Sequence, residues 1–278
     1  MRRPAPWLAP LIEEEVHERL RNDPRTLAKP GTLLGWSHDQ VYSTVIEGGQ
    51  AEFDQPIGDL LGADRALLYA RFNLPRHLDE LGDAFGQLFS SFSRAGTPTL
   101  IDLGCGPFTA GLSLAEALGP ESAFHYHGFD RATSMGELGR RFAEGARRRG
   151  ALHGRTTWGF GSDLDGHDFG KLRNDMTIVV ASYVLASRTI EAGPLASSVL
   201  RAIKRIGPGP AVFLYTNSAT PWSNRNFAPF RDALVAGGFK VVFDGVERFL
   251  QTRNPADLRY ALLFREAQAT IDLGGEAP

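Results

Sequence analysis

The sequence Thr99-Leu-Ile-Asp-Leu-Gly-Cys-Gly-Pro-Phe-Thr-Ala-Gly111 carries the strongest structural signal of this 278-residue chain. Its apolar start, Leu100 to Leu103, is typical of a buried strand. Gly104 and Gly106 then indicate a turn, and the apolar residues that follow have helical spacing. A strand, a glycine turn and a helix in this order receive nucleotide-like ligands in doubly wound sheets, because glycines let the backbone approach the ligand closely.

A second apolar run, Phe124-His-Tyr-His-Gly-Phe129, ends at Asp130. An acidic residue about 20 or more positions beyond the glycine turn can accept hydrogen bonds from the hydroxyls of a ribose. The dinucleotide fingerprint G-x-G-x-x-G requires a third glycine where this chain has Thr109. The pattern therefore disfavours a nicotinamide oxidoreductase and indicates a different nucleoside ligand.

The run Asp102-Leu-Gly-Cys-Gly-Pro107 resembles the first motif of class I S-adenosylmethionine-dependent methyltransferases. In that family an acidic residue ends the first strand and glycines follow at alternate positions, as Asp102, Gly104 and Gly106 do here. The next alternate position, often glycine in the family, is Phe108. The resemblance covers residues 97–266. It implies an enzyme that binds S-adenosyl-L-methionine and transfers the methyl group to an oxygen or nitrogen acceptor by in-line displacement.

The composition is that of an ordinary globular protein, with 42% hydrophobic and 22% charged residues. The net charge of −2 means that no global field attracts nucleic acid. Cys105 is the only cysteine, which excludes an intramolecular disulfide and a cysteine metal cluster. No apolar run reaches the roughly 18 residues of a membrane helix, and the start lacks the apolar region of a secretion signal. We therefore expect a cytoplasmic protein without a membrane partner.

Two regions of the chain differ in pattern, and we expect a helical cap over residues 1–95 and a cofactor-binding domain over residues 96–278. Apolar stripes at Leu8–Leu20 and Leu78–Phe92 predict helices in the cap, and a helix that begins near Leu60 is expected to end at Asn73-Leu-Pro75. Exposed stripes of this size are unusual on a soluble monomer. We therefore expect the cap to lie as a lid over the open edge of the sheet or to form part of a homodimer interface.

From residue 97 onward strands alternate with helices, which predicts a Rossmann-like, doubly wound α/β fold with a mostly parallel, seven-stranded sheet. Two closing strands without a helix between them resemble the antiparallel last strand of the family. Ser134-Met-Gly-Glu137 predicts a capping box at the start of a helix. The strands are expected near residues 98–103, 123–129, 155–160, 176–182, 211–215, 239–243 and 260–264.

Ligands of such sheets bind beyond the carboxyl ends of the strands, so the residues there are the candidates for cofactor binding. The resemblance implies that the glycine turn meets the methionine part of the cofactor, that Asp130 holds the ribose and that Asp163 meets the adenine amino group. Asp163 as a solvated turn carboxylate is an equal alternative, because Asp165 and Asp168 share its loop. The cofactor candidates are Asp102, Gly104, Cys105, Gly106, Pro107, Asp130, Arg131, Asp163 and Ser182.

The acceptor side has its own candidates. Tyr183 follows the fourth strand, where the family usually places residues next to the methyl group. Asn217 and Trp222 belong to a polar loop after the fifth strand, which suits a substrate wall or a simple surface connection. His38 lies in a polar loop of the cap, either facing substrate as a base or on the surface. We therefore take Tyr183, Asn217 and His38 as catalytic candidates, and Tyr183 and Trp222 as substrate contacts.

Two other kinds of chemistry are disfavoured. A nucleophilic role for Cys105 lacks a local histidine motif. His125 and His127 alternate on the second strand and point to one face of the sheet. No third ligand is spaced for a metal, so we expect no metal site and predict that both histidines pack against a helix.

Five arginines crowd the helix after the second strand, and they are Arg140, Arg141, Arg147, Arg148 and Arg149. They are either an RNA-binding patch or the solvated face of an amphipathic helix, and the acidic balance of the chain favours the latter. We expect a small-molecule acceptor.

The alternative to a small-molecule enzyme is an RNA-associated assembly protein with little or no catalysis. The stretch Met176–Ser187 and the helical start resemble the methyltransferase-like proteins of the mitochondrial small ribosomal subunit. The metal-cluster cysteines of that family are missing here. The RNA-associated hypothesis therefore depends on the arginine-rich helix and on this faint resemblance.

Overall fold

One seven-stranded sheet forms the centre of the computed structural model, which describes residues 4–92, 96–249 and 256–268. The order across the sheet is β3-β2-β1-β4-β5-β7-β6, in which the first five strands are parallel and β7 runs antiparallel between β5 and β6. This order confirms the predicted Rossmann-like sheet with an antiparallel last strand. The strands are β1 (Thr99–Leu103), β2 (His125–Phe129), β3 (Thr157–Gly161), β4 (Thr177–Ser182), β5 (Ala211–Ser218), β6 (Lys240–Phe249) and β7 (Ala256–Arg265).

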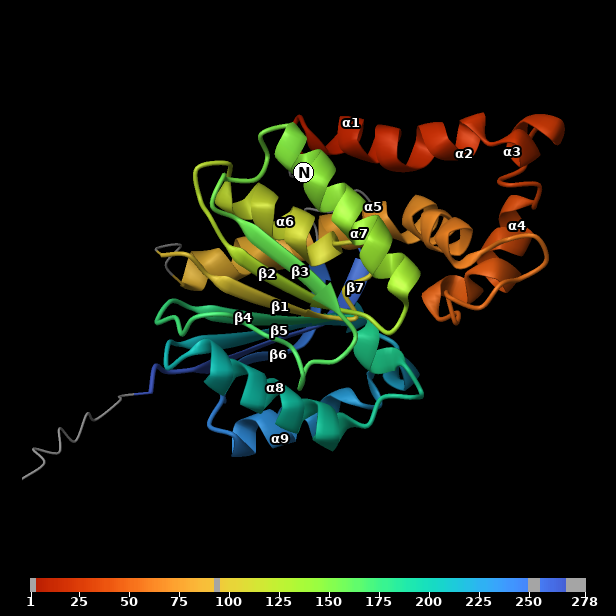
Figure 1. The fold of residues 1–278 in the computed structure, drawn as a ribbon. Coiled ribbons are helices and arrows are strands. Elements are labelled where there is room, and N and C mark those ends of the chain that lie inside the picture. The colour runs from red at the N-terminus through yellow and green to blue at the C-terminus, as the bar shows by residue number, and fades with distance from the viewer. Residues whose placement is uncertain (1–3, 93–95, 250–255, 269–278) are drawn as a thin grey trace, which may run out of the picture.

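Helices cover both faces of the sheet (Figure 1). Helices α5 (Gly62–Ser91), α6 (Thr109–Leu118) and α7 (Thr133–Arg148) cover one face, and α8 (Ala192–Ile206) and α9 (Phe227–Ala236) cover the other. A hydrophobic core lies on each face of the sheet. Successive side chains of a strand point to opposite faces, so Leu100 enters the core under α5, α6 and α7, and Ile101 enters the core under α8 and α9. Burial on both faces explains why β1 and β4 read as continuous apolar runs.

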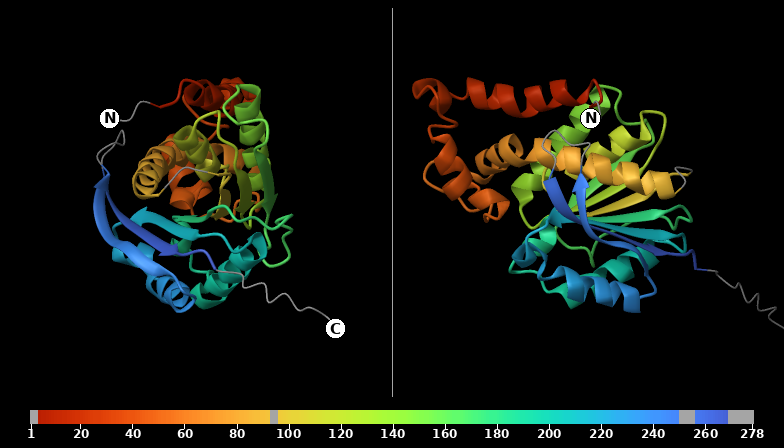
Figure 2. Two further views of the ribbon diagram at one scale, coloured as in Figure 1. Left: turned by 90° about the vertical axis from the view of Figure 1, so that its left-hand side faces the viewer. Right: turned by 180° about the vertical axis from the view of Figure 1, so that it is seen from behind.

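The residues before α5 form a series of short helical elements beside this sandwich (Figure 2). Leu11 and Val16 belong to the same hydrophobic core as Leu78 of α5 and Leu100 of β1. The division into two domains at residue 95 and the role of a lid stay predictions, and the core is continuous across that position. These elements are α1 (Leu8–Ile12), the π-helix η1 (Glu13–His17), α2 (Glu18–Asn22), α3 (Pro24–Ala28), α4 (His38–Gln40), the π-helix η2 (Val41–Val45) and the 3₁₀-helix η3 (Glu47–Gly49).

Helix α5 does not end at Pro75, and the predicted break at Asn73-Leu-Pro75 is wrong. The helix continues through Pro75 to Ser91. Proline in a helix interior costs about 3 kcal/mol, because it removes a hydrogen bond and its ring crowds the preceding turn. Leu74, Leu78 and Phe85 are all buried within α5, so the apolar surface buried on both sides of Pro75 offsets that cost.

The predicted capping box at Ser134 is also wrong. Helix α7 begins at Thr133, and its first turn is capped by Asp54, which lies far away in the sequence. The Asp54 carboxylate accepts hydrogen bonds from the backbone N–H groups of Thr133 at 2.7 Å and Ser134 at 3.0 Å. A carboxylate at a helix N-terminus satisfies free N–H groups and complements the helix dipole. The loop that contains Asp54 is thereby attached to α7.

The arginines of α7 and its C-cap combine solvent exposure with ion pairs. Arg140 and Arg148 are exposed, as the prediction of a solvated face requires. Arg141 also forms an ion pair with Glu15 at 2.9 Å, Arg148 lies 3.5 Å from the same carboxylate, and Arg149 pairs with Glu14. Glu15 is 2% exposed although it is a charged residue, so these ion pairs attach η1 to α7. The chain has no described helix that is both long and apolar enough to cross a membrane.

We predict that Glu15→Ala lowers the free energy of unfolding by about 1.5–3 kcal/mol, since it removes the charged hydrogen bonds of Arg141 and leaves that side chain only the backbone carbonyl of residue 15. Urea unfolding followed by circular dichroism measures the change. Glu18→Ala is the matched control, because Glu18 is an exposed carboxylate of the neighbouring helix α2. Equal effects of the two substitutions would contradict the assigned role of Glu15.

Candidate functional site

The turn after β1 requires glycine at two positions. Gly104 and Gly106 have φ values of 63° and 49°, in the left-handed region that side chains disfavour. A Cβ atom on Gly104 would lie 2.6 Å from the Val184 side chain, so the loop after β4 packs directly on this backbone. The close approach of the glycine turn to a ligand stays a prediction.

Phe108 occupies the position where the resembled family often has glycine, and its backbone is left-handed with φ of 70°. The ring is fully buried and lies edge-to-face against Tyr126 with centroids 4.5 Å apart. It also fills the space beside Gly111, where an added Cβ would lie 2.0 Å from the ring. Packing of the ring therefore stabilises the strained backbone of Phe108. Because the ring fills the space beside Gly111, position 111 is the one that requires a small residue.

Asp102 lies beneath the turn. Its carboxylate is 3% exposed and accepts a hydrogen bond from the Tyr126 hydroxyl at 2.8 Å. Burial raises the pKa of Asp102 to about 7, and the Asp130 carboxylate adds to the increase, while the Tyr126 hydrogen bond opposes it. Asp102 therefore supports the turn from inside the protein.

Asp130 connects the ends of two strands. Its two carboxylate oxygens accept hydrogen bonds from the backbone N–H groups of Gly106 at 3.0 Å and Ala132 at 2.9 Å. Burial raises the pKa of Asp130, while the two backbone hydrogen bonds act in the opposite direction. The carboxylate thus has a fixed orientation at the edge of the sheet where ligands bind.

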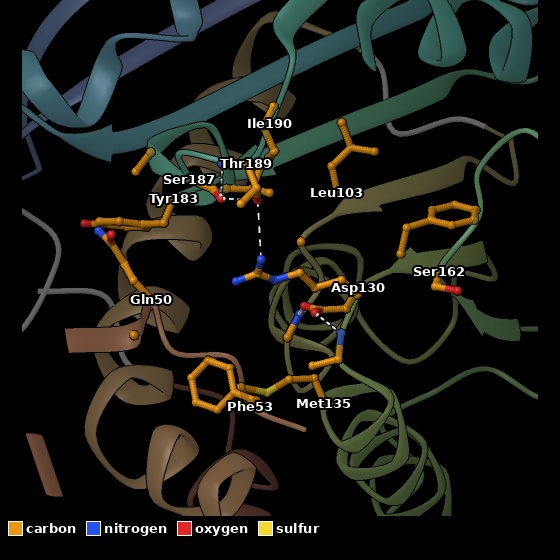
Figure 3. A pocket seen from close by; sticks show the side chains of 18 of the residues that line it. Gln50, Phe53, Leu103, Asp130, Met135, Ser162, Tyr183, Ser187, Thr189 and Ile190 are labelled. Atoms are coloured by element: carbon orange, nitrogen blue, oxygen red, sulfur yellow. Dashed lines mark hydrogen bonds between the residues drawn. The ribbon is translucent and has the colours of Figure 1, made fainter. Parts of the chain in front are cut away.

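A cavity of about 970 Å³ opens at this edge (Figure 3). In Figure 3, Tyr183 and Gln50 lie at one side, Leu103 and Ser162 at the other, and Asp130 between them. Six of the predicted site residues line the cavity together, and they are Gly104, Gly106, Asp130, Arg131, Ser182 and Tyr183.

The other predicted cofactor residues lie outside the cavity lining. Asp102, Cys105 and Pro107 are buried behind the turn. The Asp163 carboxylate accepts hydrogen bonds from the backbone N–H groups of Asp165 at 2.9 Å and Gly166 at 3.0 Å, as the turn alternative predicted. Ser162 and Leu164 line the cavity on either side of it.

Three acceptor-side candidates also lie outside the cavity lining. Asn217 is fully buried, and its amide donates hydrogen bonds to the Tyr215 hydroxyl and the Ser223 carbonyl, each at 2.9 Å. Trp222 is 58% exposed, and His38 is an exposed residue whose ring lies 6.1 Å from that of Phe72. Their catalytic or substrate roles stay predictions, and Tyr183 alone among the four acceptor-side candidates is part of the cavity wall.

The wall opposite the sheet comes from residues that the sequence did not single out. Residues 47, 49–53 and 69 line the cavity, so the N-terminal half of the chain forms one side of it. Arg65 of α5 holds this loop, because its guanidinium donates hydrogen bonds to the carbonyls of Val45 at 3.0 Å and Glu52 at 2.7 Å. The sequence signal that could have indicated this wall is Arg65, a charged side chain within an otherwise apolar helix face.

The predicted residue Arg131 has two partners that the sequence did not single out. The Arg131 guanidinium lies 2.7 Å from the Glu52 carboxylate and donates a hydrogen bond to the Thr189 hydroxyl at 3.3 Å. Arg131 therefore links the N-terminal wall to the loop before α8.

The two histidines of β2 do not pack against a helix as predicted. His127 Nδ1 lies 2.9 Å from His167 Nε2, and the His127 ring also contacts Phe169, both in the loop after β3. His125 Nδ1 lies 2.8 Å from the Thr157 hydroxyl of the neighbouring strand. Burial and the adjacent His167 lower the pKa of His127 to about 3, so the His127 ring is uncharged at neutral pH.

Comparison with known proteins gives structural neighbours only. A TehB-like S-adenosylmethionine-dependent methyltransferase from Corynebacterium glutamicum is 17% identical, with a TM-score of 0.41 over 67% of this chain and 88% of the other. A methyltransferase of the same cofactor class from Clostridium acetobutylicum is 10% identical, with a TM-score of 0.48 over 73% of this chain and 98% of the other. The cyclase SpnF is 18% identical, with a TM-score of 0.45 over 69% of this chain and 82% of the other.

No protein-family model matches the chain, and no curated protein does either. The identities and TM-scores of the structural neighbours are low. The fold assignment therefore rests on the strand order and on the geometry of the glycine turn.

We predict that the difference in unfolding free energy between the wild-type protein and Asp102→Asn depends on pH. The pKa of Asp102 is raised to about 7 in the folded protein, so folding takes up a proton and the wild-type gains stability as the pH falls from about 8 toward 4. The gain is on the order of 2–4 kcal/mol, and the asparagine variant lacks it. Urea unfolding of both proteins between pH 8 and pH 5 measures it, and a difference that does not change with pH would contradict the assignment.

Proposed function

We propose that this chain binds S-adenosyl-L-methionine in the cavity and transfers its methyl group to a small-molecule acceptor. The observation that carries the proposal is Asp130, a carboxylate held by the backbone N–H groups of Gly106 and Ala132 and facing a cavity beside a left-handed glycine turn. The sheet order β3-β2-β1-β4-β5-β7-β6, which resembles that of class I methyltransferases, supports it.

The residues of the cavity fit the three parts of this cofactor. The Asp130 carboxylate retains acceptor capacity for the ribose hydroxyls. The glycine turn leaves room for the methionine part, because a Cβ atom on Gly106 would have Tyr69 as its only neighbour within 4 Å, at 3.8 Å. Apolar side chains suited to an adenine ring also line the cavity, and they are Leu103, Leu164, Ile190 and Leu195.

In methyl transfer the main task of the protein is to align the reacting groups. The bound cofactor supplies an activated methyl group on its sulfonium. The protein's part is to hold the acceptor in line with that group and to exclude water. Tyr183 is suited to the acceptor side, since it follows β4 and its strained backbone, with φ of 62°, places it in the cavity wall. Asn217 would act as a positioning residue through Tyr215, whereas His38 and Trp222 would need a movement of their loops to reach the acceptor.

Two observations favour a small acceptor over RNA. The cavity of about 970 Å³ is near the upper end of the roughly 300–1,000 Å³ typical of small-molecule sites, which leaves space beside the cofactor. Arg141 and Arg148 of α7 and the next residue, Arg149, are paired with glutamates of η1, so fewer charges are available for phosphate contacts than the sequence indicates.

We expect Asp130→Asn to weaken binding of S-adenosyl-L-methionine by about ten- to a hundredfold, because hydrogen bonds to a charged group are lost. Isothermal titration calorimetry measures the dissociation constant. Asp163→Asn is the matched control, since Asp163 follows the next strand and its carboxylate is used by its own turn. Wild-type protein that binds NAD but not S-adenosyl-L-methionine would overturn the proposed function.

The RNA-associated alternative makes a different prediction. Binding to RNA through α7 would weaken steeply with salt, by several powers of ten between about 50 and 200 mM. We expect only weak binding of a mixed transfer RNA sample at about 150 mM salt, measured by fluorescence anisotropy. Tight, salt-sensitive binding that Arg140→Gln and Arg147→Gln reduce would favour the alternative.

A further inference from the structure

A polar bridge connects two opposite walls of the cavity. The Glu52 carboxylate of the N-terminal wall lies 2.7 Å from the Arg131 guanidinium, which also donates a hydrogen bond to the Thr189 hydroxyl at 3.3 Å. The Thr189 hydroxyl lies 3.0 Å from that of Ser187. Figure 3 shows Ser187 and Thr189 across the cavity from Phe53, the residue after Glu52. The Arg131 side chain therefore joins walls that come from distant parts of the chain.

The bridge lies on the solvent side of the cavity. Glu52, Arg131 and Thr189 all line the cavity and are exposed, and 47% of the Arg131 side chain and 61% of the Glu52 side chain are accessible. Leu103 and Met135 line the same cavity and are buried. The bridge thus lies between the solvent and the buried part of the lining.

Separate hydrogen bonds hold the two walls. Arg65 donates to the Val45 and Glu52 carbonyls on the N-terminal side. On the other side, Asn226 Nδ2 donates to the Ser187 carbonyl at 2.8 Å. Rotamers of exposed side chains exchange within nanoseconds, much faster than segments of backbone move. The part of the bridge that moves most easily is therefore the Arg131 side chain itself.

Arg131 directly follows the proposed ribose carboxylate. The backbone N–H groups of Gly106 and Ala132 hold the Asp130 carboxylate at 3.0 and 2.9 Å. A nucleoside bound to Asp130 therefore lies beside the Arg131 side chain. Ion pairs between exposed groups are weak, so the bridge to Glu52 opens readily enough to let a ligand pass.

We propose that Arg131 is a side-chain gate, whose bridge between Glu52 and Thr189 closes the cavity over the bound cofactor and slows both its entry and its release. This inference rests on the proposed function. The gate acts on entry and release alike, so opening it changes both rates and leaves the dissociation constant nearly unchanged. Loss of one exposed ion pair corresponds to a change of about two- to fivefold, which sets the size of the expected effect.

Surface plasmon resonance with S-adenosyl-L-homocysteine on the immobilised full chain measures both rates. We expect Glu52→Gln to raise the association and dissociation rates by about two- to fivefold each, while the dissociation constant changes less than twofold. The same substitution should have no effect in an Arg131→Gln protein, because the ion pair is already lost there. Glu191→Gln is the matched control, because Glu191 is an exposed carboxylate that lines the same cavity without an ion pair to any described residue.

Chemical labelling of arginine tests the bridge without a ligand. Phenylglyoxal modifies accessible guanidinium groups, and peptide mass spectrometry gives the rate at each position. Arg188 is the internal reference, because it is an exposed arginine of the same cavity lining without a hydrogen bond or ion pair to any described residue. We expect Glu52→Gln to raise the labelling rate of Arg131 relative to Arg188 by about two- to fivefold.

The outcomes separate the gate from the proposed function. If S-adenosyl-L-homocysteine binds the wild-type protein and Glu52→Gln leaves both rates unchanged or lowers them, the gate is wrong. An unchanged labelling ratio in Glu52→Gln also overturns it, because Arg131 is then not held by Glu52 in solution. If S-adenosyl-L-homocysteine does not bind the wild-type protein, the proposed function fails and the gate for this cofactor fails with it, while the labelling ratio shows whether the bridge itself exists.

Discussion

The hydrogen bond between the backbone N–H of Gly106 and the Asp130 carboxylate is the interaction on which the site depends. It joins the turn after β1 to the end of β2 and leaves the same carboxylate at the edge of the cavity. The left-handed backbone of Gly104 and Gly106 makes this geometry accessible, because a side chain at Gly104 would collide with Val184. Strand pairing, turn conformation and ligand position are therefore coupled through one acidic side chain.

The N-terminal part of the chain is a structural wall of this site. Arg65 and Asp54 hold the loop at residues 47–55 against α5 and α7, and Glu15 attaches η1 to α7. Each of these contacts uses a charged group whose partners lie on another element. Charged groups of this kind are costly to bury unless they are fully paired, so they determine where the N-terminal elements lie more strictly than apolar packing does.

Groups of both charges lie beside Tyr183. Carboxylates lie around Tyr69, His77 is neutral because it is buried, and Arg76 is paired with Glu80 and lies over the Tyr183 ring. The strained backbone of Tyr183 is held by its stack on His77 and by Arg76, which are contacts from a helix more than 100 positions earlier in the sequence.

The sequence alone determined the α/β sheet, the glycine turn and Asp130, because these depend on local patterns: apolar runs, glycine spacing and an acid at a strand end. The antiparallel end of the sheet was expected only from the resemblance to class I methyltransferases. It could not decide whether α5 continues through Pro75, since burial of Leu74 and Leu78 outweighs a local penalty. Only the tertiary structure brought Tyr69 and Glu52 to the cavity and left Asp163, Asn217 and Trp222 outside its lining. Contacts between residues far apart in the chain produce no periodic pattern in the sequence. The sequence therefore cannot distinguish a polar side chain that faces solvent from one that faces a ligand.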